Sequence, residues 1–154
     1  MDRVPGLTDA DSAHREDLRA LAQWAERTFR LYVSLAARYD RFPGALIVGQ
    51  QQTRAAIQDL LQRHRVSVPG TAADADAWVA SRVLADGTSA ADLIDATLAA
   101  TLRVLDGALR GDIDSGTRTA YQNLYAAVLR QERLVRSWPS AGCRSGASCG
   151  GILR

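Results

Sequence analysis

The chain has 154 residues, of which 47% are hydrophobic and 23% charged, with 19 basic and 17 acidic side chains. A chain of this length and apolar content is expected to form one domain without disulfides or metals, and it is too apolar to be wholly disordered. No apolar run approaches the ~20 residues of a membrane span. Every basic residue is arginine, and two of them lie in residues 139–154, which hold no acid, so residues 1–138 carry 17 charges of each sign. This balance argues against a nucleic-acid-binding domain, which carries a basic excess.

The first amphipathic segment follows a short arm, residues 1–7. It begins at the capping pattern Thr8–Asp11 and ends at a break over residues 40–44. The first twenty residues are charged throughout and lack the apolar stretch of a secretory signal, which favours a cytoplasmic location. Steps of three and four between apolar positions predict a helix with one buried face. That face consists of Leu18, Leu21, Ala25, Thr28, Tyr32, Leu35 and Tyr39.

A second helix is predicted from Pro43, which is tolerated in a first turn, to a stop at Val68–Gly70. A short helix follows from Thr71 to about Asp86, with Trp78 as its packing anchor. We expect this short helix to carry the chain from one end of the molecule to the other. The face predicted to be buried on the second helix consists of Gln50, Thr53, Ile57, Leu60 and His64.

The third long helix opens at the capping pattern Ser89-x-x-Asp92 and ends before Gly111, a natural C′ residue. The fourth runs from about Ser115 to Trp138. With no strand alternation anywhere, these segments predict an all-α domain over residues 8–138, an antiparallel four-helix bundle with a short extra helix between helices two and three. The predicted buried faces are Ile94, Leu98, Thr101, Leu105 and Ala108 on the third helix, and Tyr121, Leu124, Val128, Gln131, Val135 and Trp138 on the fourth.

Residues 139–154 are rich in glycine and serine, which predicts a flexible tail. Both cysteines of the chain, Cys143 and Cys149, lie in this tail and are expected to be reduced thiols in a cytosolic protein. Three functional hypotheses for the tail stay open beside an unstructured end. They are a thiol site for a soft metal or redox pair, the modified core of a peptide precursor, and a docking peptide at residues 150–154.

Di-metal sites in four-helix bundles use about six inward carboxylate and imidazole ligands, including Glu-x-x-His motifs. This chain has no Glu-x-x-His. Asp11-x-x-His14 has ligand spacing but falls in the first turns, where we expect a solvated helix start. His64 is expected to be a half-buried residue at a helix end. The three glutamates are scattered along the chain, at Glu16, Glu26 and Glu132.

Four stretches of the chain together resemble the sequence pattern of a known family. They are Trp24–Tyr32, Phe42–His64, Ser89–Leu109 and Ala120–Trp138, with Gln50-Gln51-x-Thr53 leading to Leu60-Leu61 and Tyr121-Gln122-Asn123-Leu124 as the most characteristic pieces. In this order and at these spacings, over about residues 8–138, the chain resembles a ferritin-like branch of prokaryotic proteins classed as a domain of unknown function. The resemblance implies a ferritin-like four-helix bundle.

The resemblance also implies where metal ligands would lie, and every one of those positions is neutral here. The family's inward glutamate of helix one falls on Ala25, its Glu-x-x-His on Gln50 and Thr53, its helix-three glutamate near Thr101, and its helix-four histidine on Gln131. Buried carboxylates without a metal would repel one another and lose their hydration, whereas glutamine and threonine can hydrogen-bond without charge. We therefore predict a neutral polar layer of the last four residues. The alternative is that one or two of them, Gln50 among them, turn outward or reach water.

These features lead us to expect a non-enzymatic ferritin-like bundle that has lost its metal ligands and holds no cofactor. It would act as a binding or scaffold module for an unknown protein partner or a second copy of itself, with no nucleic-acid or membrane partner. We expect no nucleophile–histidine constellation, because both histidines fall near helix ends and both cysteines in the tail, and no glycine-rich phosphate loop occurs. A second hypothesis is a metal-binding oxidoreductase or metal-storage protein that recruits Asp106, Asp59 or the tail thiols. A third is a small-molecule pocket in the vacated metal site, which predicts a cavity near Ala25 lined by glutamine and threonine.

Overall fold

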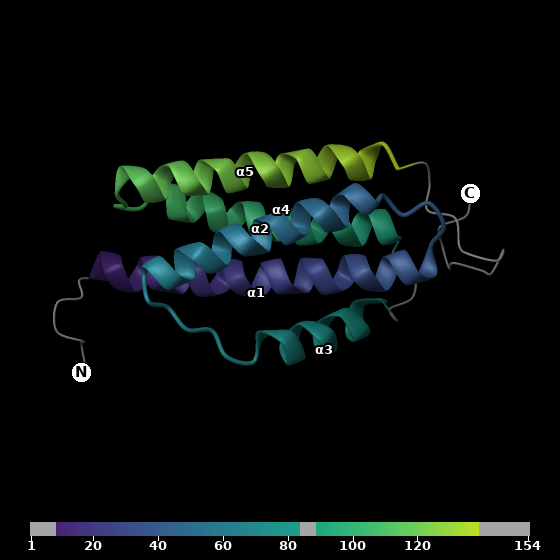
Figure 1. Cartoon of the computed structure of the whole chain (residues 1–154), viewed down its shortest axis with the longest axis horizontal. Coiled ribbons are helices and arrows are strands. Elements are labelled where there is room, and N and C mark those ends of the chain that lie inside the picture. Colours follow the sequence, from purple (N-terminus) through teal and green to yellow (C-terminus); the bar gives the residue numbers. More distant parts are fainter. Residues whose placement is uncertain (1–8, 84–88, 139–154) are drawn as a thin grey trace.

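The computed structural model describes residues 9–83 and 89–138, and within them the chain is all-helical, as predicted. The cap residue Thr8 and the tail with Cys143 and Cys149 lie outside the described residues. In the described part, no helix is both long enough and apolar enough to span a membrane. The helices are α1 (Asp9–Arg38), α2 (Gly44–Arg63), α3 (Thr71–Val83), α4 (Ala90–Arg110) and α5 (Ser115–Arg136) (Figure 1).

The four long helices, α1, α2, α4 and α5, surround a common core. α1 packs against α2 and α4, and α5 packs against the same two helices. Neighbours within each pair α1–α2 and α4–α5 run in opposite directions, whereas α2 and α4 run the same way (Figure 1). The chain must therefore return along the molecule between α2 and α4. It does so through α3, which packs on the outside of α1, so the predicted role of the short helix is confirmed.

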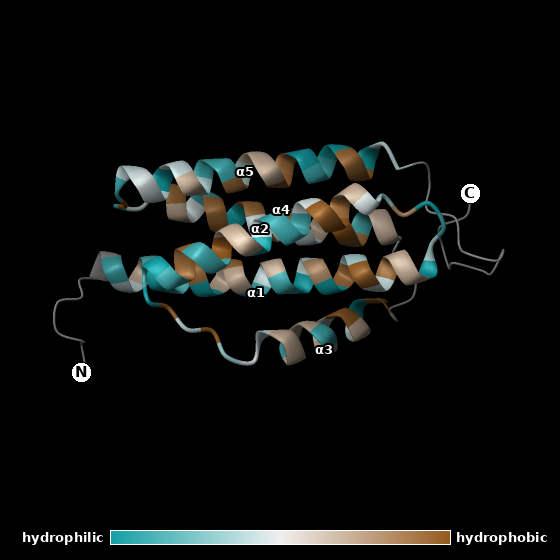
Figure 2. Cartoon of the chain, viewed as in Figure 1, coloured by the Kyte–Doolittle hydropathy of each residue, from teal (hydrophilic) through white to brown (hydrophobic). Residues whose placement is uncertain are grey.

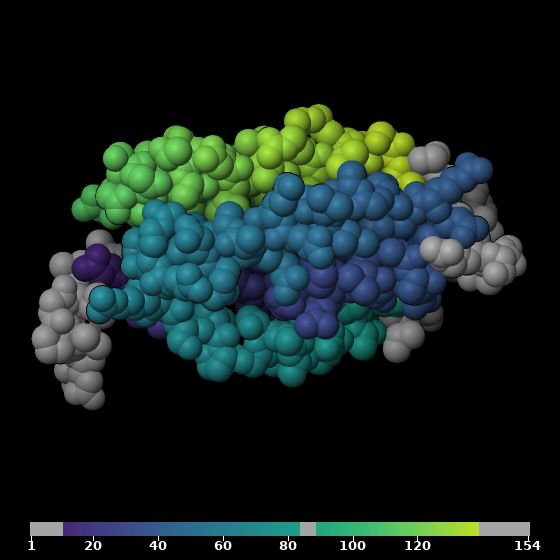
Figure 3. All heavy atoms as spheres, viewed as in Figure 1, coloured from purple at the N-terminus to yellow at the C-terminus, as the bar shows by residue number. Residues whose placement is uncertain are grey.

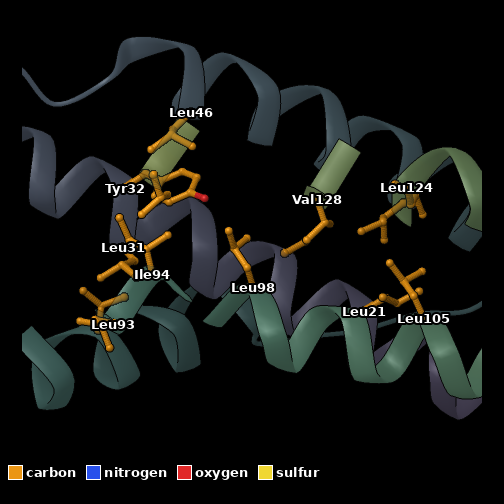
Figure 4. Close-up of a cluster of buried hydrophobic side chains, with 14 of the residues drawn as sticks. Leu21, Leu31, Tyr32, Leu46, Leu93, Ile94, Leu98, Leu105, Leu124 and Val128 are labelled. Atoms are coloured by element: carbon orange, nitrogen blue, oxygen red, sulfur yellow. The ribbon is translucent and has the colours of Figure 1, made fainter. Parts of the chain in front are cut away.

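The predicted faces of the long helices are buried. All members of the α1 face, from Leu18 to Tyr39, are buried, and so are those predicted on α4 and α5. On α2 only His64, at the helix end, is partly exposed. The leucine, isoleucine and tyrosine side chains of this core point toward one another from different helices (Figure 4), while polar residues occupy the outer positions of the same helices (Figure 2). Burial of each such leucine contributes ~1.5–3 kcal/mol, which explains why the helices pair along these faces.

α2 ends earlier than predicted, at Arg63 instead of Val68. The backbone N–H of Val66 donates to the Leu61 carbonyl at 2.9 Å, and that of Arg65 donates to the Gln62 carbonyl at 3.2 Å. This is the Schellman pattern of helix termination, with Arg65 in the left-handed C′ position at a φ of 55°. The sequence prediction relied on glycine and proline as stop signals and therefore missed an arginine in this role.

Side chains cap α4 and α5. The hydroxyl of Ser89 accepts from the N–H of Asp92 at 3.0 Å, which confirms the predicted start of α4. The sequence predicts Gly111 as the C′ residue of this helix, but it is the C-cap of α4, with extended backbone at φ −78° and ψ 175° in place of the left-handed conformation common at C′. Arg118 makes the left-handed turn unnecessary, because its guanidinium donates to the carbonyls of Leu109 and Gly111. The carboxylate of Asp114 caps α5 by accepting from the N–H of Thr117 at 2.7 Å.

α3 is held on α1 by an aromatic pair. The rings of Trp24 and Trp78 meet edge to face with centroids 5.7 Å apart, which confirms Trp78 as the packing anchor of the short helix. The guanidinium of Arg27 lies 4.8 Å from the Trp24 ring and 5.4 Å from the Trp78 ring. Edge-to-face pairs and cation–π contacts each stabilise by roughly 0.5–1.5 kcal/mol, so this cluster fixes the position of the crossover.

Candidate functional site

A chain of buried hydrogen bonds crosses the core where the resemblance places metal ligands. Tyr32 of α1 donates its hydroxyl to Gln131 Oε1 of α5 at 2.6 Å, and Gln131 Nε2 donates to Gln50 Oε1 of α2 at 3.0 Å. Gln50 Nε2 in turn donates to the backbone carbonyl of Ala25 on α1, also at 3.0 Å. Both glutamines are 2% exposed. We call these four residues the central network; it is neutral and every donor points the same way along it.

The two threonines of the predicted polar layer lie outside the central network. Thr101 is buried, but its hydroxyl donates to the Thr97 carbonyl one turn earlier in α4, at 3.2 Å. Thr53 is also buried, and its Oγ1 has no hydrogen-bond partner among the described residues. The prediction of bonds across the core was therefore right for the two glutamines and wrong for the two threonines. Thr101 bonds its own helix instead, as short threonine hydroxyls readily do, whereas Thr53 bonds no described residue.

Burial determines the protonation of Tyr32. Removal from water raises the pKa of its hydroxyl far above the usual value, and the nearby carboxylate of Asp95 raises it further. The hydroxyl therefore stays protonated and acts as the donor that starts the central network. The sequence did place Tyr32 on the buried face of the first helix, but nothing in one helix's periodicity reveals a partner 99 positions away.

The two histidines of the chain meet at one end of the molecule, which the sequence did not predict. His14 of α1 and His64 at the end of α2 lie edge to face, with ring centroids 4.7 Å apart. His14 Nε2 is 2.6 Å from the hydroxyl of the buried Tyr121 on α5. His14 is therefore half-buried and hydrogen-bonded, and the expected solvated helix start is wrong. Antiparallel pairing brings the first turns of α1 beside the last turn of α2. The predicted antiparallel arrangement could therefore have indicated that the two histidines lie close together.

Burial and neighbouring groups shift several pKa values in this histidine cluster. Burial, followed by the charge of His64, lowers the pKa of His14, and burial raises the pKa of Tyr121. The ring of His14 accepts the hydroxyl proton of Tyr121 in the tautomer that leaves Nε2 unprotonated. His64 Nε2 lies 3.3 Å from the hydroxyl of Thr117, which itself donates to Asp114. Those two bonds from Thr117, backbone N–H first, hold the pKa of Asp114 below its usual range.

The donors present do not fit a di-metal centre. Among the described residues, no group of three or more histidine, cysteine, aspartate or glutamate side chains is arranged to hold a metal ion. Two aspartates considered as substitute ligands, Asp59 and Asp106, are exposed, and Asp59 pairs with Arg63 at 3.3 Å. Neither carboxylate points into the core. Cys143 and Cys149 lie outside the described residues.

A pocket of about 530 Å³ opens between α1, α2 and the segment that leads to α3. Figure 3 shows it as a hollow with atoms of α1 at its floor, between α2 and the following segment. Ala25 lines it, together with Gln51, Gln58 and Thr71, but it is not the pocket of the third hypothesis, which was expected at the vacated ligand positions. It lies on the outer side of the α1–α2 pair, whereas the central network occupies the space inside.

One end of this pocket is an ion cluster. Glu26 accepts from Arg54 of α2, with Nε 3.1 Å from Oε1 and Nη2 3.2 Å from Oε2, and from Arg30 at 3.0 Å. The guanidinium of Arg54 also lies over the ring of Phe29, 4.0 Å from its centroid. Glu26 is only 14% exposed, so this pairing is partly shielded from water. The sequence placed Glu26 one position off the buried face and did not suggest its partners.

Comparisons of this chain with protein-family models, with curated proteins and with solved structures found no match.

Proposed function

We propose that the chain is a ferritin-like four-helix bundle that has lost its di-metal site and acts as a non-enzymatic binding module. Its topology supports this proposal, because ferritin-like folds join two antiparallel helix pairs by one long crossover. Here α1–α2 and α4–α5 are the pairs, and α3 forms part of the crossover. Helix packing of this kind positions groups from facing helices at the centre of the core, where family members bind metal.

The observation that carries the proposal is the direct bond between Gln131 and Gln50. The resemblance assigns these positions to a histidine and a glutamate, and their side chains do meet across the core from α5 and α2. A glutamine pair needs no cation, since amides satisfy each other at about 0.5–1.5 kcal/mol per bond. A carboxylate in the same place would need a partner charge or a metal, because desolvation strongly disfavours an isolated buried charge. The neutral pair thus supports a core in which these two positions need no metal.

Restoring the ligands tests this proposal. A variant with Ala25→Glu, Gln50→Glu, Thr53→His and Gln131→His carries two carboxylates and two imidazoles at the centre. We expect it to bind Co²⁺ or Mn²⁺ at about one ion per chain and to unfold at a temperature that rises with metal concentration, because the ion binds only the folded state. The parent chain is expected to show neither effect.

The control places the same residue types on the outer face of α2, as Gln52→Glu with Ala56→His, both at exposed positions. If the fourfold variant does not fold, as judged by circular dichroism, the pair Gln50→Glu with Gln131→His replaces it. A folded variant that binds no more metal than the outer-face control would contradict the ferritin-like assignment.

A further inference from the structure

The α1–α2 pocket has the volume of a site for a small organic molecule. Its volume of about 530 Å³ falls within the ~300–1,000 Å³ range of ligand sites. Three alanines, one of them Ala55 at its mouth, leave this space between two helices that otherwise pack through larger side chains. The side chains that form its apolar wall come from α1, α2 and the segment after α2, and they are Ala22, Ala25, Ile57, Leu61, Val66 and Val68.

The unused hydrogen-bonding groups at the ionic end of the pocket are donors of an arginine. Arg54 uses its Nε and Nη2 atoms on Glu26, and within the described residues no bond of its Nη1 is present. The Glu26 carboxylate, in contrast, accepts three hydrogen bonds from two arginines. A molecule entering the pocket therefore meets unused donors on Arg54, which is 34% exposed, and a carboxylate that is already occupied.

The net charge at the ionic end of the pocket also favours an anionic ligand. Arg30 and Arg54 together carry one positive charge more than Glu26. Asp76 lies 3.7 Å from Arg30 but is 62% exposed, so water screens its contribution. Stacking on Phe29 and bonding to Glu26 hold the guanidinium of Arg54 in one orientation before any ligand binds. Pre-organised guanidinium groups are the side chains best suited to recognise carboxylates.

We infer that this pocket binds an amphipathic organic carboxylate, with the apolar body of the molecule against the alanine-rich wall and its carboxylate on Arg54. Exposed Gln51, Gln58 and Ser67 stand at the rim, where they can bond further polar groups of the molecule. This inference names the ligand class of the binding module proposed above and rests on that proposal for its biological meaning.

The test uses phenylacetate and indole-3-acetate as probes, each beside its neutral amide, with binding followed by NMR shifts of backbone amides in the full chain. We expect millimolar or tighter binding of the acids, with shifts concentrated in residues 22–26, 51–61 and 66–71. Each acid is expected to bind at least about tenfold more tightly than its amide, since a hydrogen bond to a charged group is worth ~1.5–3 kcal/mol. Equal affinity of acid and amide, or no shift with either acid, would overturn the inference.

Two pairs of variants locate the site. Arg54→Gln should remove the preference for the acid over the amide, while Arg63→Gln on the same helix, outside this pocket, should keep it. Ala55→Phe should fill the mouth and weaken binding at least about tenfold, judged by the area a phenyl ring removes from the ligand. Ala56→Phe, at the next exposed position, should change it less than twofold, a bound set by its distance from the pocket.

Thermal unfolding of each variant verifies that it is folded. Equal effects of Ala55→Phe and Ala56→Phe would place binding elsewhere and overturn the inference. Failure of this inference and of the proposed function are separable, because metal binding reports on the core and acid binding reports on the outer pocket.

Discussion

Gln131 offers the sharpest test of the central network, because it has a bond on each side. Replacement by leucine keeps most of the volume but leaves the Tyr32 hydroxyl and Gln50 Oε1 without their partner. Each unsatisfied buried group costs ~1–3 kcal/mol, so Gln131→Leu should lower the free energy of unfolding by about 2–4 kcal/mol after the gain in apolar burial. Gln52→Leu, at an exposed position of α2, should change it by less than ~0.5 kcal/mol.

A double-mutant cycle with Tyr32→Phe isolates the bond between the two side chains. In the parent chain Tyr32→Phe should cost about 1–2 kcal/mol, because it leaves Gln131 Oε1 without its donor. In the Gln131→Leu background it should be neutral or stabilising, because it removes a hydroxyl that is already unpaired. Urea denaturation followed by circular dichroism gives both values. An equal cost of Tyr32→Phe in the two backgrounds would refute the network.

Three further predictions concern the helix ends and the histidine cluster. Arg65→Gly should raise the free energy of unfolding by about 1 kcal/mol, because glycine adopts a left-handed φ without strain. Gln52→Gly, inside α2, should lower it by a similar amount. Urea denaturation measures both values, and a destabilising Arg65→Gly would contradict the assigned end of α2. Ser89→Ala should cost about 1 kcal/mol by removing the cap of α4, and a change no larger than that of the exposed Ser81→Ala would argue against the cap. The pKa of His14 is lowered in the folded chain, so the unfolded chain binds more protons below about pH 6.5. The free energy of unfolding should therefore be at its full value above that pH and fall as the pH drops through the folded pKa. His14→Gln should flatten this pH dependence in urea denaturation, and an unchanged pH dependence would exclude His14 as its source.

The sequence predicted the interior of each helix well and its ends less well. Periodicity depends on burial alone, and burial follows the helical repeat, so the faces from Leu18 to Tyr39 and from Tyr121 to Trp138 emerge without knowledge of neighbouring helices. The end of α2 depends instead on one residue's backbone conformation. Arg65 adopts a conformation for which glycine is the usual signal, so residue type gave no indication of it.

Pairings across the core mark the other limit of the sequence. Gln50 and Gln131 were matched because their positions were aligned to one metal site, and the structure brings them together. Tyr32 and the Ala25 carbonyl completed the network without any such guide, since one is a long-range contact and the other a backbone atom. The pocket beside Glu26 likewise depends on how three segments converge, which no single segment's pattern contains.

The metal content of the purified parent chain tests the account most directly. After expression in medium supplied with iron, manganese and copper, elemental analysis should find far less than one ion per chain, and added metal should leave the unfolding temperature unchanged. One or more tightly held ions per chain, lost on Gln50→Leu or Gln131→Leu, would contradict the account.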